Sequence, residues 1–535
     1  MTIRKRGESS DRKKLLTNHH ESGEEEDIHE HSDLRGDYLN IALLFFLYLL
    51  QGIPLGIGQA IPMLLQNRGA SYKEQAEFSF AYWPFSIKLL WAPLVDSIYF
   101  KAIGRRKSWM IPTQYLIGIF MLILSQHVGS WLGDGHESMP RVAVITLIFF
   151  SLNFLAATQD IAVDGWALSM LKKRNVAHAS TCNSVGQTAG YFLGYVVFMA
   201  FESKEFCNKY IFSEPREQGL VTLSGFLYFW GVVFLTTTTI IGLLKKEKKE
   251  TQEQLEEHPD LGIKETYTML WKIVTMKPVM LLAVLLLTVK VSFSACDAVT
   301  SLKLIDHGIP KEKLAMLAIP LVPLQLLLPL IMSKHITGKY PMNFYIKAIP
   351  FRLLLTLVTA AIVWATPLII REQTDDIPYY YYGLLLVTYS FYQIFLYAMF
   401  CSAMSFFAKI SDPKIGGTYM TLLNTLHNLG GNWPNTMVLW LIDFITWKSC
   451  VSDGNQNNFS APKLNDNACL THQEQEDCFK IGGKCRVDID GYYIEVILCL
   501  IYGIFWYKWG RSKINELQKL PVKAWHVFQS KTKSS

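Results

Sequence analysis

Asn183–Gly190 reads NSVGQTAG, and Asn424–Gly431 reads NTLHNLGG. The two segments share one pattern, in which Asn precedes Ser or Thr, an amide lies four residues after the Asn, and a Gly closes the segment. They are 241 residues apart, and each belongs to a long apolar stretch. The repeat predicts a chain built from two related halves, with the two segments on equivalent helices.

The composition indicates a membrane protein. Of the 535 residues, 50% are hydrophobic and 18% are charged, whereas a soluble protein carries about 25% charged residues. These values exclude a disordered chain, a coiled coil and an ordinary soluble enzyme. The net charge of +6 is mild, and no basic motif with interleaved aromatic residues is present, so the expected partner is the lipid bilayer and not nucleic acid.

Apolar stretches of about 20 residues cross a bilayer as helices. The sequence predicts an all-α polytopic membrane protein with twelve transmembrane helices, near 39–65, 77–99, 108–132, 140–169, 177–201, 221–244, 278–304, 314–333, 346–370, 379–408, 415–446 and 491–510. Because each half has an even number of helices, the halves are parallel repeats about an axis along the membrane normal. That is the architecture of the major facilitator superfamily.

The predicted domain organisation follows from these helices. A disordered cytosolic tail (1–38) precedes an N-terminal six-helix bundle (39–244), and a charged cytosolic linker (245–277) joins it to a C-terminal six-helix bundle (278–510). A basic cytosolic tail (511–535) ends the chain. Basic residues gather in the loops after the second, fourth and tenth helices, in the linker and in the last tail, so the positive-inside rule places both termini in the cytosol.

The same orientation places the segment 447–490 outside the cytosol. This cysteine-rich loop contains Cys450, Cys469, Cys478 and Cys485. Four thiols in a non-cytosolic loop predict two disulfides, for which three pairings are open. Asn458 begins a glycosylation sequon in the same loop.

Two short sorting signals compete. Lys531 and Lys533 lie five and three residues from the C-terminus, which matches the dilysine retrieval signal of endoplasmic-reticulum membrane proteins. The stretch from Asp11 to Leu16 fits an acidic dileucine sorting motif instead. The endoplasmic-reticulum membrane is the favoured location.

The loop after the second helix resembles the signature of the major facilitator superfamily. Asp96 is followed by Gly104, Arg105 and Arg106, and the resemblance implies that Asp96, Arg105 and Arg106 help to close the cytosolic side. The first glycine of that signature is replaced here, and the fourth helix carries aspartates where the family often has an arginine. Proton coupling is therefore not carried over from the family.

Longer stretches resemble a particular branch, the acetyl-CoA transporters of solute carrier family 33 in the endoplasmic-reticulum membrane. The similarity extends over about residues 39–510 and rests on 49–56, 83–96, 156–166, 180–187 and 416–424. It implies import of cytosolic acetyl-CoA into the lumen by alternating access, with CoA as a candidate counter-substrate. The imported acetyl groups would supply luminal acetyltransferases that modify protein lysines and gangliosides. No cofactor and no metal are implied.

Buried ionisable residues are the candidate site residues, because charges inside a bilayer are costly unless they are paired or wetted. The phosphates of acetyl-CoA call for cations, which form charge-assisted hydrogen bonds with phosphate. Lys88, Lys290 and Arg352 lie within predicted helices. Each is a candidate for phosphate binding, and a structural ion pair is the alternative for Lys88 and Lys290.

The repeat segments add amides, which either bind substrate or bond between helices. The candidate substrate-binding residues of this kind are Asn183, Gln187, Asn424 and Asn428, and Trp433 is a candidate for stacking on adenine. Asp160 and Asp164 lie one turn apart on the fourth helix, where a gate pair with a cation of another helix is the favoured interpretation and a proton-coupling site is the alternative. Asp297 is a further candidate gate carboxylate.

Two other functions stay open. A membrane-bound acetyltransferase would need an intramembrane base, and His427 is the clearest candidate. A related permease for another anionic solute is the second. The repeated halves favour a transporter over an enzyme.

Overall fold

The computed structural model describes residues 36–100, 102–133, 140–171, 175, 177–245, 247, 262–336, 340–371, 377–411, 416–452, 463–469, 474, 478–480 and 482–526. Seven helical segments in this part of the chain are long and apolar enough to cross a membrane. They are α2 (Tyr38–Asn67), α6 (Lys107–Leu132), α7 (Val142–Met170), α11 (Leu223–Leu244), the segment from α14 (Lys277–Val289) to α15 (Ser294–Asp306), α18 (Met342–Arg371) and α19 (Tyr379–Ile410). The mostly helical fold confirms the predicted class.

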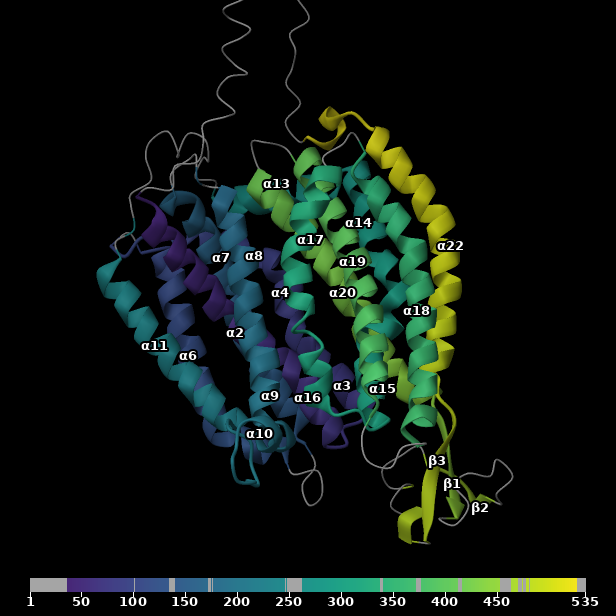
Figure 1. Cartoon of the computed structure of the whole chain (residues 1–535). Helices are drawn as coiled ribbons and strands as arrows, with labels where there is room; N and C mark the ends of the chain where they lie inside the picture. Colours follow the sequence, from purple (N-terminus) through teal and green to yellow (C-terminus); the bar gives the residue numbers. More distant parts are fainter. Residues whose placement is uncertain are drawn as a thin grey trace, which may run out of the picture.

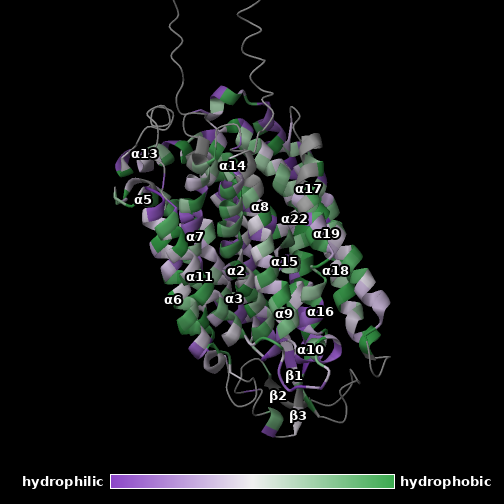
Figure 2. Ribbon diagram, turned by 60° about the vertical axis from the view of Figure 1, so that its left-hand side comes forward, coloured by the Kyte–Doolittle hydropathy of each residue, from purple (hydrophilic) through white to green (hydrophobic). Residues whose placement is uncertain are grey.

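Further helices run beside these seven. They are α8 (Ala177–Phe192), which continues through the π-helical η5 (Leu193–Val197) into α9 (Phe198–Glu202), then α17 (Leu321–Ile336), α20 (Gly416–Ile445) and α22 (Gly491–Lys519). Large apolar side chains on the outer faces are exposed, among them Leu243, Trp364 and Phe505. Figure 2 shows hydrophobic residues along the length of the helices and hydrophilic residues around the strands.

The second predicted helix, 77–99, is wrong as a single element. The chain instead forms α3 (Tyr72–Ser79), η2 (Phe80–Tyr82), α4 (Trp83–Ile87), η3 (Lys88–Leu90) and α5 (Ala92–Ser97). Pro84 and Pro93 lie at the starts of α4 and α5. Proline has no N–H to donate and clashes with the preceding turn, so each proline begins a new helix. The seventh predicted helix is likewise interrupted, by η6 (Lys290–Phe293) between α14 and α15.

The helices form two groups, which Figure 1 shows side by side. The N-terminal group holds α2, α6, α7, α8 and α11, and the C-terminal group holds α14, α15, α18, α19, α20 and α22. The two repeat segments lie on α8 and α20, which pack against α2 and α14 respectively. A Cβ on Gly190 would come within 2.0 Å of the Leu49 carbonyl oxygen, and a Cβ on Gly430 within 2.2 Å of the Leu286 oxygen. Each repeat segment therefore uses a glycine to bring its helix against the first helix of its half.

The predicted cysteine-rich loop contains a small antiparallel sheet with the strand order β2-β1-β3. The strands are β1 (Trp447–Ser452), β2 (Lys463–Ala468) and β3 (Gly483–Ile489). Disulfides join Cys450 to Cys478 and Cys469 to Cys485. The strands are short and largely polar, so they lack the alternating apolar pattern that predicts a strand.

We name the two ends of the bundle by what they carry. The sheet end carries β1–β3 together with α10 (Lys204–Tyr210) and α16 (Lys311–Met316). The α13 end carries α13 (Ile263–Val274), the start of α2 and the end of α22 with η9 (Val522–Trp525). The helix α13 falls in the predicted linker 245–277, and α22 continues nine residues beyond the predicted end of the last helix.

Some predicted features lie outside the described residues. These are the first 35 residues, the sequon at Asn458, the retrieval signal at Lys531 and Lys533, and the side chain of Asp96.

Candidate functional site

A cavity of about 460 Å³ lies between the two halves, and we call it the central cavity. From the N-terminal half it is lined by Leu55 of α2 and by Gln187, Thr188 and Tyr191 of α8. From the C-terminal half it is lined by Lys290, Gln325, Arg352, Gln393, Leu396, Tyr397, Met399, Phe400, His427 and Asn428. A cavity at the interface of two repeats is where transporters of this architecture bind their substrates.

The two repeat segments, on α8 and α20, both face the central cavity. Gln187 and Asn428 occupy the same position of the repeat pattern and both line the cavity, one from each half. His427 lines it as well, at the repeat position that Gly186 holds in the N-terminal half. Equivalent helices therefore present equivalent amides to one space.

Lys290 is a cation of this cavity that forms no ion pair with a described residue. It lies in η6, where α14 gives way to α15. Its Nζ donates a hydrogen bond to the His427 carbonyl oxygen at 2.9 Å. A carbonyl satisfies one N–H but does not neutralise the charge, and an uncompensated charge in a bilayer is costly. Lys290 is thus suited to an anionic ligand.

Arg352 is the second cation of the cavity, and it forms an ion pair with a carboxylate. Its Nη2 donates to both carboxylate oxygens of Asp297, at 3.1 and 3.0 Å, and to the Tyr392 hydroxyl at 2.5 Å. The guanidinium carbon lies 4.1 Å from the centre of the Phe293 ring, which adds a cation–π contact. Arg352 is 1% exposed, and its Nε has no hydrogen-bond partner among the described residues.

Two more polar atoms of the cavity residues are buried without a partner in the described part of the chain, namely Gln393 Oε1 and His427 Nδ1. Buried polar atoms are nearly always hydrogen-bonded, so these atoms and Arg352 Nε need an explanation. Two cations against one carboxylate leave this group of residues with an excess of positive charge. The arrangement suits a polar anion.

A second polar cluster lies in the N-terminal half. Lys88 Nζ forms an ion pair with Asp160 Oδ2, and Gln51 Nε2 donates to Asp160 Oδ1 at 2.6 Å. Asp164 Oδ1 accepts from the Tyr48 hydroxyl at 2.7 Å and from Asn183 Nδ2 at 3.1 Å. None of these residues is among those that line the central cavity. The structure therefore brings Lys88 and Asn183 onto the aspartates of α7.

Asn424 and Trp433 also lie away from the central cavity lining. The Trp433 Nε1 donates to the Leu287 carbonyl oxygen at 2.8 Å, which ties α20 to α14. Trp433 therefore serves in helix packing, as an aromatic residue in a helix most often does.

The profile of the acetyl-coenzyme A transporter 1 family matches residues 40–261 and 248–527. This chain belongs to that family. Similar proteins include an uncharacterized protein of Schizosaccharomyces pombe, 32% identical over 91% of this chain and 89% of its own length. An uncharacterized membrane protein of Saccharomyces cerevisiae is 30% identical over 90% of this chain and 96% of its own length.

Solved structures show the fold of this family member. The nucleoside transporter NupG aligns with a TM-score of 0.54 at 11% identity, over 90% of this chain and 99% of its own. A bacterial homologue of the human lysosomal transporter Spinster, in an inward-facing and occupied conformation, aligns with a TM-score of 0.52 at 12% identity, over 92% and 99%. The chain has the major facilitator fold, and family and fold together indicate a membrane transporter rather than an enzyme.

Two of the predicted gate residues of this family member, Arg105 and Arg106, lie at the α13 end. Arg105 and Arg106 precede α6, and the backbone N–H of Arg106 and that of Lys107 donate to the Glu247 carboxylate at 3.1 Å. The Arg106 guanidinium lies against Gly165 of α7, within 2.6 Å of where a Cβ would stand. Glu247 was missed by the sequence analysis, in which it was only one charge of a charged linker.

Several residues of the central cavity were also missed. Gln325 and Gln393 are amides within apolar helices, and that contrast was a usable signal. Tyr397, Phe400 and Met399 gave no signal, because an aromatic or apolar residue in a transmembrane helix is ordinarily packing.

Proposed function

We propose that this protein carries acetyl-CoA across a membrane by alternating access around the central cavity. The observation that carries the proposal is the excess positive charge of that cavity, with Lys290 unpaired among the described residues and Arg352 retaining an unused buried N–H. Phosphate groups bind such donors through charge-assisted hydrogen bonds. Gln187 and Asn428, one from each half, supply the uncharged contacts that both halves need in order to close on one ligand.

The direction and location of transport are further parts of the proposal. The disulfide-linked sheet belongs in an oxidising compartment, so the sheet end faces the lumen of the endoplasmic reticulum and the α13 end faces the cytosol. Both termini are then cytosolic. Acetyl-CoA enters the lumen, where acetyltransferases use it for protein lysines and gangliosides, and CoA leaves as the counter-substrate.

Transport is tested by reconstituting the full chain in liposomes and measuring uptake of labelled acetyl-CoA, with and without CoA inside. Saturable uptake that internal CoA accelerates is the expected result. Saturable uptake whose rate is the same with and without internal CoA would show that transport does not exchange acetyl-CoA for CoA. No saturable uptake by protein that remains folded would overturn the proposal.

His427 favours one alternative, a membrane-bound acetyltransferase. Its imidazole is buried in the cavity wall, and its Nδ1 is unpartnered among the described residues. An acetyltransferase needs no sealed compartment, so transfer of labelled acetyl groups to an acceptor in detergent solution would support it. A His427→Gln variant that still transfers acetyl groups to the acceptor would exclude His427 as an essential base.

A further inference from the structure

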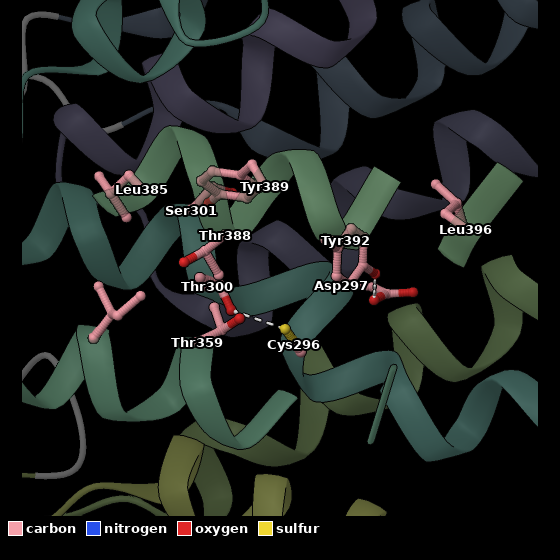
Figure 3. Close-up of a pocket in the computed structure, with 11 residues that line it drawn as sticks. Cys296, Asp297, Thr300, Ser301, Thr359, Leu385, Thr388, Tyr389, Tyr392 and Leu396 are labelled. Atoms are coloured by element: carbon pink, nitrogen blue, oxygen red, sulfur yellow. Dashed lines mark hydrogen bonds between the residues drawn. The ribbon is translucent and has the colours of Figure 1, made fainter. Parts of the chain in front are cut away.

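A second cavity, of about 270 Å³, lies within the C-terminal half between α15, α18 and α19 (Figure 3). We call it the inner cavity. Leu396 lines both cavities. Arg352 lines the central cavity, while its partners Asp297 and Tyr392 line the inner one. The two cavities therefore adjoin at the Arg352–Asp297 ion pair.

The inner cavity is elongated away from that ion pair. In Figure 3, Leu396 lies beyond Asp297 and Tyr392 at one end, and Leu385 lies at the other. Thr300, Thr359 and Cys296 lie between these ends. A group that entered past Leu396 would pass the ion pair first and reach uncharged side chains afterwards.

The wall of the inner cavity offers little to a charged ligand. Several hydroxyls are already used, since Thr359 donates to the Leu355 carbonyl at 2.7 Å and Thr388 to the Leu384 carbonyl at 2.9 Å. Thr300 is bonded to the Tyr492 hydroxyl at 3.0 Å. Asp297 is the one carboxylate among the lining residues, and Arg352 already pairs with it. What remains is an uncharged surface, which suits a small group of low polarity.

We infer that the inner cavity receives the acyl end of the substrate while the central cavity holds its phosphates. The inference rests on the proposed function and adds the order in which the substrate lies. A CoA thioester has its anionic groups and its acyl group at opposite ends, and the two cavities present cations and uncharged walls in that same order. The inner cavity is then the part of the protein that distinguishes acetyl-CoA from CoA.

The wild-type protein tests this inference without any substitution. Purified full-length protein binds labelled acetyl-CoA, and unlabelled CoA, acetyl-CoA, butyryl-CoA and palmitoyl-CoA compete for it. Acetyl-CoA and butyryl-CoA should bind more tightly than CoA, since each buried methylene strengthens binding roughly fourfold. Palmitoyl-CoA should lose this advantage because its chain exceeds the cavity.

Two variants locate the effect in the inner cavity. Thr388→Phe fills it and should abolish the preference for acetyl-CoA over CoA while CoA affinity stays the same. Leu385→Ala enlarges it and should improve binding of butyryl-CoA severalfold relative to acetyl-CoA. Val387→Phe is the control, since Val387 is exposed on the same helix and lines neither cavity.

The outcomes separate the two proposals. If no CoA compound binds or is transported by folded protein, the proposed function fails. If CoA and short acyl-CoAs bind wild-type protein equally, or if Leu385→Ala leaves the ratio of butyryl-CoA affinity to acetyl-CoA affinity unchanged, the acyl inference is overturned and the phosphate site stands. The Leu385→Ala result and the wild-type series decide the matter even where Thr388→Phe does not fold.

Discussion

Lys290 and Arg352 differ in how the protein compensates their charge. Arg352 has a carboxylate, a hydroxyl and an aromatic face around it, whereas Lys290 has a carbonyl oxygen. A ligand that brings negative charge therefore gains more at Lys290, where no described carboxylate has to be displaced.

Lys290→Gln should weaken acetyl-CoA binding by about 10- to 100-fold, because a hydrogen bond to a charged group is worth about 1.5–3 kcal/mol. Equilibrium binding of labelled acetyl-CoA to purified protein measures the change. Lys277→Gln is the control, since Lys277 is exposed at the start of the same segment. Equal affinity in the two variants would remove Lys290 from the site.

Lys88 is expected to behave differently, because it is paired with a buried carboxylate. Lys88→Met leaves Asp160 charged and unpaired, which costs about 3–5 kcal/mol of folding stability. Thermal unfolding of detergent-purified protein should show the loss, and the double variant Lys88→Met with Asp160→Leu should recover part of it. A stable Lys88→Met protein with weakened acetyl-CoA binding would instead make Lys88 a substrate contact.

At the scale of elements, the pairs α2–α8 and α14–α20 hold the two repeat segments in place. Close approach is possible because Gly52 and Gly190 meet on one pair and Gly430 lies against α14 on the other. The amides Gln187 and Asn428 project into the central cavity from helices whose positions these glycines fix. Packing on one side of α8 and α20 thus sets the geometry of the site on the other.

Gly190→Ala should destabilise the protein by about 1–3 kcal/mol, because the new methyl group would overpack against the Leu49 carbonyl. The melting temperature in detergent measures this. Gly129→Ala on α6 is a matched control, since nothing lies within 4 Å of a Cβ at that position. If Gly190→Ala and Gly129→Ala change the melting temperature equally, the contact between α2 and α8 has room for a methyl group at Gly190.

At the scale of the whole molecule, polar contacts join the two halves near the sheet end. Asp306 accepts from Gln66 at 2.6 Å and from the Tyr72 hydroxyl at 2.5 Å. Lys311 forms an ion pair with Glu202 at 3.1 Å. These contacts hold the two halves together at the sheet end, and the alternating access proposed above would require them to break.

Closure of the sheet end should depend on pH through Glu312. Burial raises the pKa of this carboxyl, and the nearby Glu205 carboxylate raises that pKa further, against the effect of Lys311. The closed form binds the proton more tightly than the open form, so closure is favoured below the raised pKa and is lost as pH rises through it. Amide hydrogen exchange of α16 between about pH 5 and pH 8, corrected for intrinsic rates, should show protection at low pH only.

Glu312→Gln removes the titrating group and should keep α16 protected across that range. Glu214→Gln is the control, because Glu214 is exposed. Protection that rises with pH in the wild-type protein would contradict the assignment.

Much of the molecule follows from the order of the residues. The apolar stretches predict most of the helices, because helix formation and bilayer length are properties of a continuous segment. The repeat predicts two halves and selects α8 and α20, and both of its central amides line the central cavity. Intramembrane charge selects Lys88, Lys290 and Arg352 as candidates, since each charge in a bilayer needs a reason, and two of these three line the central cavity.

Other features depend on contacts between distant residues. Lys88 and Asp160 are 72 positions apart, and Asp297 and Arg352 are 55 apart; no spacing rule links them, and only helix packing decides which cation meets which carboxylate. The sheet with its disulfide pairing and the inner cavity arise in the same way. Residue order determined which charges are buried, and the tertiary structure decided which of them are left for a ligand, because pairing depends on distances that the sequence does not contain.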